Sequence, residues 1–376
     1  MTRYDYIICG AGCAGLSLAY YLSVSGEDKR ILLIDKDAKN TNDRTWSFWE
    51  KEQSPYESII HKSWSKINFY SSVHEEQIDI SPYRYKKIRS ADFYAFMKDH
   101  LKAYANVDFL QAEINDFKED NDGVVVSTSD GDYSCDRVFK SYLDEGFDFG
   151  SSQNVLQHFK GWEIQTEKDV FQPDVATFMD FRVEQNGEIR FLYVLPTSTK
   201  KALVEVAIFS NTILDHTTYD GILKGYIETQ LDTQTYTIVE EEFGIIPMTT
   251  YAFEQHNTAR IKHIGTAGGW VKASSGYAFK RIQHKSKALA AALVNNGDID
   301  RAISSKNRFR RYDQIFLNAL LTAKATGDEV FGKMFKRLDT DIIFKFLDEE
   351  TSFLEDLKVF TGPPTMPFFR AFIEEL

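Results

Sequence analysis

The chain has 376 residues, a net charge of −12 and 43% hydrophobic residues, which is the composition of a globular protein with a large core. The acidic balance argues against a nucleic-acid partner, because such a partner needs a basic protein face. No stretch of about 18 uninterrupted apolar residues is present, so no transmembrane helix is expected.

The cysteines Cys9, Cys13 and Cys135 lack the paired spacing of a zinc site, so no metal is expected. Two of them lie in the first motif below, where we expect small buried residues. An odd number of cysteines without a secretion signal suits a reducing compartment, so a cytoplasmic location is expected.

The N-terminal stretch predicts a strand at residues 6–9, a helix at about 14–25 and a second strand at 31–34 that ends in Asp35. A Gly-x-Gly-x-x-Gly motif joins the first strand to the helix. This order of elements indicates dinucleotide binding, and a Gly-rich turn in an unrelated α/β protein is the simpler alternative. A signal peptide does not fit, since glycines and serines break the apolar run and a strand follows it.

Each residue type in this motif has a mechanical reason. Gly10 allows the tight turn, Gly12 lets the backbone approach a pyrophosphate, and Gly15 lets helix and strand pack closely. Asp35 stands where an acid accepts the ribose hydroxyls of an adenine dinucleotide. The cofactor-binding candidates here are Gly10, Ala11, Gly12, Cys13, Ala14, Gly15 and Asp35.

A polar loop at residues 36–43 precedes Arg44 and an aromatic group that contains Trp46, Phe48 and Trp49. Two interpretations remain open for this segment. It is either a loop folded over the core or a loop that closes on cofactor or substrate.

Further strands are predicted at 64–70 and 75–80, and a helix follows with Ser90 or Asp92 as its N-cap. A helix and then a β-meander after the first βαβ unit indicate the two-dinucleotide-binding flavoprotein plan rather than a simple NAD dehydrogenase. The strands of the predicted meander lie at 107–110, 113–118, 123–129 and 131–139.

The middle of the chain predicts an antiparallel sheet that packs a helix at 218–230. Its strands are expected at 159–165, 175–183, 189–195, 201–210 and 236–247, with a hairpin connection at 196–200. The chain then returns to the first domain through a strand at 261–264, a Gly-rich loop and a helix at 279–295, and residues 301–376 are predicted to be helical.

These elements predict an α/β fold with a Rossmann-like dinucleotide-binding domain, an antiparallel β-sheet substrate domain and a helical C-terminal region. The nucleotide domain is discontinuous and takes residues 1–64, 86–150 and 259–300. The substrate domain takes 65–85 and 151–258, and the helical region takes 301–376.

Glu205 stands in an otherwise apolar strand. Alternation puts Ala202, Val204, Val206 and Ile208 on one face and Leu203, Glu205, Ala207 and Phe209 on the other. Burial of an unpaired carboxylate is costly, so we expect a raised pKa suited to proton chemistry. A structural ion pair, for example with Arg182, is the alternative.

With these residues in view, the chain resembles the flavin-dependent lycopene cyclases of carotenoid biosynthesis, of the bacterial lycopene β-cyclase type. The TWSF and LVE motifs are the most specific evidence for this resemblance. The motifs are GAGCAGLSLA at 10–19, DRTWSF at 43–48, IR at 88–89, DFY at 92–94, LQHFKGW at 156–162, FMDFR at 178–182, FLYVLP at 191–196, ALVE at 202–205, GIIP at 244–247, GTAGG at 265–269 and SGY at 275–277.

The resemblance implies FAD, active in its reduced form, with NAD(P)H as electron source and lycopene or another carotenoid as substrate. It implies cyclisation of the ψ ends through γ-carotene to β-carotene without net redox change, an intramolecular lyase reaction in which Glu205 transfers a proton or stabilises a cation. The motifs add cofactor-binding candidates, namely Arg44, Arg89, Gly265, Gly268, Gly269, Ser275, Gly276 and Tyr277, and substrate-binding candidates, namely Trp46, Phe48, Phe181, Tyr193 and Phe209.

Lycopene is insoluble in water, so peripheral attachment to a membrane surface is expected. The segment at residues 363–372 is either that contact or an ordinary packed C-terminal helix. A redox flavoprotein, either a monooxygenase or a geranylgeranyl-reductase-like enzyme, is the alternative enzyme class, and a carotenoid or lipid carrier is the non-enzymatic one.

Overall fold

The computed structural model describes residues 1–150, 152–305, 307–322 and 326–364. The first sheet has the strand order β8-β2-β1-β11-β10-β9, with β17 paired to β11. β8, β2, β1, β11 and β17 are parallel, and β9, β10 and β11 form the antiparallel meander. The bounds are β1 Thr2–Cys9, β2 Ile31–Asp35, β8 Val107–Gln111, β9 Ile114–Glu119, β10 Val124–Thr128, β11 Gly131–Lys140 and β17 Ile261–His263.

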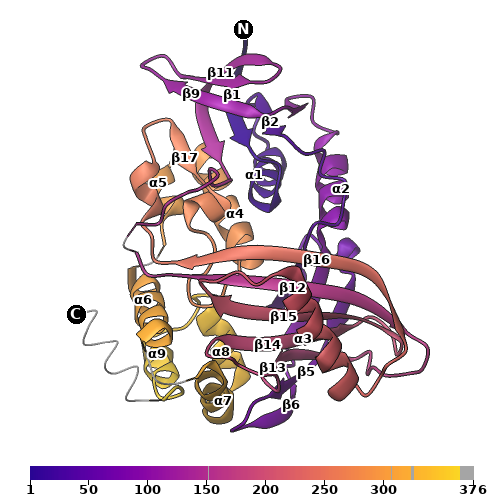
Figure 1. The fold of residues 1–376 in the computed structure, drawn as a ribbon. Helices are drawn as coiled ribbons and strands as arrows, with labels where there is room; N and C mark the ends of the chain where they lie inside the picture. The colour runs from indigo at the N-terminus through magenta and orange to yellow at the C-terminus, as the bar shows by residue number, and fades with distance from the viewer. Residues whose placement is uncertain (151, 306, 323–325, 365–376) are drawn as a thin grey trace.

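Helices cover one face of this sheet. α1 (Cys13–Val24) packs against α2 (Ser90–Leu101) and against α4 (Phe279–Val294), as Figure 1 shows. Their apolar side chains join those of β1 and β2 in one buried cluster. The βαβ unit and the meander predicted from the sequence are therefore confirmed, and the chain returns to this sheet through β17 as expected.

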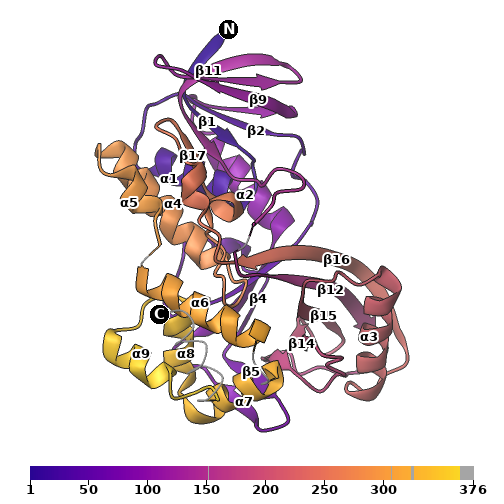
Figure 2. The ribbon, with the colours of Figure 1, turned by 60° about the vertical axis from the view of Figure 1, so that its left-hand side comes forward.

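A second sheet has the order β16-β12-β15-β14-β13-β5-β6 and is antiparallel except where β13 meets β5. Its strands are β5 Lys66–Tyr70, β6 Glu75–Asp79, β12 Asn154–Thr166, β13 Val175–Asp180, β14 Ile189–Pro196, β15 Lys201–Ser210 and β16 Tyr236–Thr249. Figure 2 shows α3 (His216–Thr229) on one side of this sheet and the C-terminal helices on the other.

The predicted alternation along β15 is confirmed. Ala202, Val204, Val206 and Ile208 pack in the cluster under α3. Leu203, Ala207 and Phe209 face the opposite cluster, which contains side chains of the C-terminal helices. The helices of the C-terminal region are α5 Ile299–Ile303, which packs on α4, and α6 Asn307–Thr322, α7 Gly327–Arg337, α8 Thr340–Leu347 and α9 Phe353–Val359.

A small third sheet corrects one expectation. The Arg44 to Trp49 segment is not a loop, because most of it forms β3 (Thr45–Glu50), paired with β7 (Arg84–Arg89), which also pairs with β4 (Lys62–Trp64). The strand predicted at 64–70 is broken at Ser65, so that β4 and β5 belong to different sheets.

The predicted caps of α2 are also wrong. Ser90 is the first residue of the helix and Arg89 holds the cap position without a side-chain bond. The Ser90 hydroxyl instead accepts the backbone N–H groups of Asp43 and Arg44 at 2.9 and 3.1 Å, which fixes the approach to β3.

Cys9, Cys13 and Cys135 are buried free thiols, as expected for small core residues. No helix within the described ranges has the length and apolarity needed to cross a bilayer. The candidate membrane contact lies, from residue 365 onward, outside the described residues.

Short connecting 3-10 turns complete the described elements. They are η1 Glu57–Ile59, η2 Phe253–His256 and η3 Gly265–Gly268. Between η3 and α4, the buried Lys272 ammonium lies 2.8 Å from the Asp313 carboxylate of α6 and 3.5 Å from that of Glu349. This ion cluster fastens the Gly-rich loop to the C-terminal helices.

The Lys272→Met variant keeps the apolar stem of the side chain but removes the charge that Asp313 faces. Loss of one partner of a buried ion pair costs about 3–5 kcal/mol, so the urea midpoint of unfolding should fall clearly. Lys102→Met, which removes an exposed pair with Asp99, serves as control and should change little. Equal midpoints for the two variants would contradict the structural role of Lys272.

Candidate active site

The glycine loop after β1 has a shape that only glycine allows. Gly10 has φ of 100°. A Cβ at Gly15 would lie 1.9 Å from the Gly10 carbonyl oxygen, so α1 approaches the strand as closely as a bare backbone permits. Gly12 caps α1 without a side-chain bond, and no acid stands in the first turn. The N-terminal N–H groups of α1 are therefore available to an anion.

Asp35 stands at the end of β2, beside this loop. Its Oδ2 accepts the backbone N–H of Ala11 at 2.7 Å, and its Oδ1 accepts that of Asp37 at 2.8 Å. The carboxylate thus supports the glycine loop and also lines the adjoining cavity.

The second Gly-rich loop lies directly against the first. A Cβ at Gly265 would come within 2.7 Å of the Ala14 Cβ, and Gly265 has φ of 59°. Farther along the loop, Ser275, Gly276 and Tyr277 line the same cavity as Gly10 and Gly12. The two loops, distant in sequence, therefore form one wall.

One cavity of about 480 Å³ connects these loops to the second sheet. Gly10, Gly12 and Asp35 line one part of it, while Tyr193 and Glu205 line another. Trp46 and Phe159 add aromatic surface. A nucleotide at the glycine loop would therefore share a continuous space with the acid of the apolar strand.

Glu205 belongs to a row of residues that crosses the second sheet. Tyr193 of β14 pairs with Glu205 of β15, which pairs with Gly161 of β12, which pairs with Glu242 of β16. Side chains in one such row point to the same face of a sheet. The row therefore brings two carboxyl groups to the same face of the sheet, where Glu205 lines the cavity.

The pKa of the Glu205 carboxyl lies well above its ordinary value. Burial is the largest cause, followed by the neighbouring Glu242 carboxyl, while Lys87 acts in the opposite direction. The surface that Glu205 keeps faces the cavity. The ion pair considered for Glu205 does not form, because Arg182 instead binds Asp180 at 2.7 Å.

Neutral tyrosines surround this acid. The hydroxyls of Tyr193 and Tyr277 lie 3.2 Å apart, and burial raises the pKa of both well above the usual value. Burial likewise raises the pKa of Tyr85, which also feels the Glu205 charge. Uncharged hydroxyls and aromatic rings thus make up much of the wall beside Glu205.

The structure brings most of the residues predicted for the site to this cavity. The predicted residues that line it are Gly10, Gly12, Cys13, Ala14, Asp35, Arg44, Trp46, Tyr193, Glu205, Gly265, Ser275, Gly276 and Tyr277.

Other predicted residues lie away from the lining. Ala11 and Gly15 shape the loop from behind, and Arg89 pairs with Glu240 at 3.0 Å. Gly268 and Gly269 line a second cavity. Three predicted substrate contacts are buried against other rings: Phe48 stacks on Phe279, and Phe181 and Phe209 pack on Phe191.

Glu242, Gly161 and Thr45 were not singled out as site residues from the sequence. Glu242 stands in a run of three glutamates, and such a run is typical of a solvated strand edge. The sequence does show that Gly244 and Ile246 share the face of the strand that carries Glu242. The position of Glu242 opposite Gly161, however, follows only from the pairing of β16 with β12.

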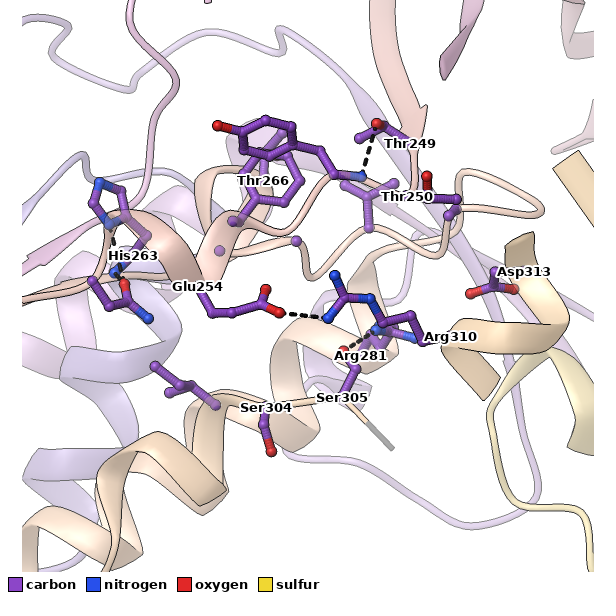
Figure 3. Close-up of a pocket in the computed structure, with 18 of the residues that line it drawn as sticks. Thr249, Thr250, Glu254, His263, Thr266, Arg281, Ser304, Ser305, Arg310 and Asp313 are labelled. Atoms are coloured by element: carbon purple, nitrogen blue, oxygen red, sulfur yellow. Dashed lines mark hydrogen bonds and ion pairs between the residues drawn. The ribbon is translucent and has the colours of Figure 1, made fainter. Parts of the chain in front are cut away.

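The second cavity, of about 340 Å³, is lined by several charged side chains and shares Pro247, Thr266 and Val271 with the first. Figure 3 shows the Arg310–Glu254 ion pair within it, with His263 and Asp313 at its sides. Burial lowers the pKa of His263 to about 4. Among the described residues, no cluster of His, Cys, Asp and Glu is suited to a metal ion.

The glycine loop at α1, the acid after β2, the meander and the antiparallel sheet define a flavoprotein fold of the two-dinucleotide-binding type. A geranylgeranyl bacteriochlorophyll reductase-like protein from Thermoplasma acidophilum has this fold, with a TM-score of 0.69 at 14% identity over 100% of both chains.

The chain belongs to the lycopene cyclase family, because the family model for lycopene cyclase protein matches residues 5–373. A lycopene beta-cyclase from Pantoea ananas is 25% identical over 98% of this chain and 97% of its own length. A lycopene beta-cyclase from Paracoccus sp. (strain N81106 / MBIC 01143) is 24% identical over 98% of this chain and 96% of its own length.

The raised pKa of Glu205 predicts a pH-dependent stability difference. Between its ordinary value of 4.5 and the raised folded value, only the folded state holds this proton, so this group lowers stability as pH rises. Glu205→Gln stays neutral and should have a higher urea midpoint than the parent at pH 8 but a similar one near pH 4.5. A pH-independent difference between the two proteins would contradict the raised pKa.

Proposed function

We propose that this protein is a lycopene β-cyclase that binds reduced FAD and converts the ψ ends of lycopene, through γ-carotene, into the β rings of β-carotene. NAD(P)H is the proposed electron source, and the substrate is taken from a bilayer. Membership of the lycopene cyclase family supports this function. The observation that carries it is that Glu205 lines the same cavity as the glycine loop.

The residues at the glycine loop fit FAD. The open N-terminus of α1 suits the pyrophosphate, and a Cβ at Gly12 would meet no protein atom within 4 Å, so the backbone is exposed to a ligand there. Asp35 suits the ribose hydroxyls, and Gly265 and Ser275 to Tyr277 add a further part of the cavity wall. Reduced FAD, when bound, supplies negative charge close to the reacting end of the substrate.

In the proposed reaction Glu205 acts as the acid. Its O–H bond breaks as a C–H bond forms at C2 of the ψ end, which leaves a cation at C1. The C5=C6 double bond then attacks C1, the C1–C6 bond closes the ring, and the cation moves to C5. Loss of the C6 proton forms the β-ring double bond, so no electrons are gained or lost overall.

The lining residues suit a transient cation. Aromatic faces at Trp46, Tyr85, Phe159 and Tyr193 attract positive charge. The neutral state of the buried tyrosines keeps them from competing as bases. The chain thus provides an acid and aromatic faces in one place, and bound FAD would add negative charge.

The activity is tested by anaerobic incubation of the FAD-loaded protein with lycopene in liposomes after reduction of the flavin. Many equivalents of β-carotene per flavin should form while the flavin stays reduced. Oxidation of one flavin per product molecule, with a hydrogenated product, would instead identify a redox enzyme.

Glu205→Gln should retain FAD but lose cyclisation by at least about 100-fold, since an amide cannot donate the required proton. Product formation is followed by chromatography and flavin content by absorbance. The matched control is Glu241→Gln, whose parent side chain is half exposed and pairs with Lys160. Near-normal turnover of Glu205→Gln would refute the assigned role.

Asp35→Ala should weaken FAD retention by about 10-fold to 100-fold, because it removes a charged hydrogen-bond acceptor. Flavin per protein after gel filtration measures the loss, and circular dichroism checks the fold. Asp37→Ala is a suitable neighbouring control, since Asp37 contributes only its backbone N–H to Asp35. Unchanged flavin content in Asp35→Ala would count against the ribose contact.

A further inference from the structure

Glu205 and Glu242 meet across a strand that lies between theirs. β12 separates β15 from β16, and neighbouring strands lie about 4.8 Å apart, so the two backbones are about 10 Å apart. Gly161 is the β12 residue between them. A Cβ there would lie 3.3 Å from the Glu205 Cβ and 3.1 Å from the Glu242 Cγ. The two side chains therefore lean over a residue that has none.

Glu242 is held in place from its other side. Its Oε2 accepts the Thr45 hydroxyl of β3 at 2.8 Å, and the residue is 7% exposed. Its Oε1 is buried and accepts no hydrogen bond from the described part of the chain. A buried acceptor without a donor is costly, and the Glu205 carboxyl, when protonated, is a donor within reach.

Among the described residues, the charged side chains nearby do not donate a hydrogen bond to the Glu242 Oε1 atom. Lys87 of β7 faces the pair, but its ammonium lies 3.6 Å from Glu163, which also binds Lys201. Arg89 of β7 is engaged by Glu240. Within the described part of the chain, tyrosines of β7, β14 and the second Gly-rich loop also lie beside Glu205.

We propose that Glu205 and Glu242 share one proton across Gly161, with Glu242 as the positioning residue that keeps the acid on Glu205 protonated and directed into the cavity. Two carboxylates this close do not both stay ionised in a buried site. The pair thus holds one proton at neutral pH. The sequence indicates only Glu205 as an acid, and Glu242 is added to it as a partner.

The catalytic consequence rests on the proposed function, whereas the shared proton does not. When the O–H proton passes to C2 of the substrate, the pair is left with two negative charges facing the cation. The proton released from C6 returns to the pair, which restores its charge for the next ring. No additional acid or base is consumed.

The shared proton is tested by infrared difference spectra of the FAD-loaded, lycopene-free protein, recorded across a pH titration. A carboxylic-acid C=O band should persist at pH 7 and disappear in Glu205→Gln. In Glu242→Gln the neutral amide removes the repulsion and donates to Glu205, so the band should titrate at least one pH unit lower, a tenfold loss of proton affinity. Glu241→Gln should leave the titration unchanged.

The pH dependence of cyclisation gives a second readout. The alkaline limb of Glu242→Gln should move to lower pH with the rate at low pH largely kept, whereas a purely structural defect lowers the rate at every pH. Gly161→Ala should separate the pair and shift the infrared titration as Glu242→Gln does, and Gly225→Ala in open space on α3 is its control.

Absence of an acid band at pH 7 in the parent protein, or an unshifted titration in Glu242→Gln, would overturn the shared proton. A protein that shows both infrared results but does not cyclise lycopene would refute the proposed function and leave the proton pair intact.

Discussion

The contact between two glycine-rich turns is the constraint on which the cavity depends. Gly15 brings α1 against the Gly10 carbonyl, and Gly265 sits against Ala14 at the start of the same helix. A side chain at Gly265 would push the second loop away from the first, and one at Gly15 would push α1 away from β1. Because that loop continues to Tyr277, whose hydroxyl meets Tyr193 of the second sheet, the same close approach determines how the nucleotide-binding sheet faces the antiparallel sheet.

The chemistry of the cavity depends on how the charged side chains around Glu205 are paired. The cation that acts on Glu205 is Lys87, and its ammonium lies 3.6 Å from Glu163. Arg182 pairs with Asp180 instead of Glu205. The acid is therefore kept neutral by burial and by a like charge rather than ionised by a partner. The aromatic faces beside the protonated carboxyl would also favour a short-lived positive charge on the proposed substrate.

Much of the fold was predictable from local pattern. The strand–glycine–helix–strand order fixed the first sheet, and period-two alternation around Glu205 placed its neighbours on the correct faces. The errors lie where distant segments decide the outcome. Residues 45–50 form a strand because β7 pairs with them, and residue 65 breaks a strand because β4 and β5 join different sheets. Glu242 was missed since its position opposite Gly161 depends on register between remote strands, with an irregularity at Glu163 that no local pattern reveals.

The ion cluster around Lys272 has a consequence for how the molecule is made. The loop that carries Ser275 and Tyr277 is anchored by Asp313 of α6 and by Glu349 beyond α8, both late in the chain. During synthesis the glycine turn at the N-terminus emerges long before these anchors. The wall of the cavity therefore cannot be completed before residue 349 has been made, so a nascent chain holds the early glycine turn without the assembled cavity.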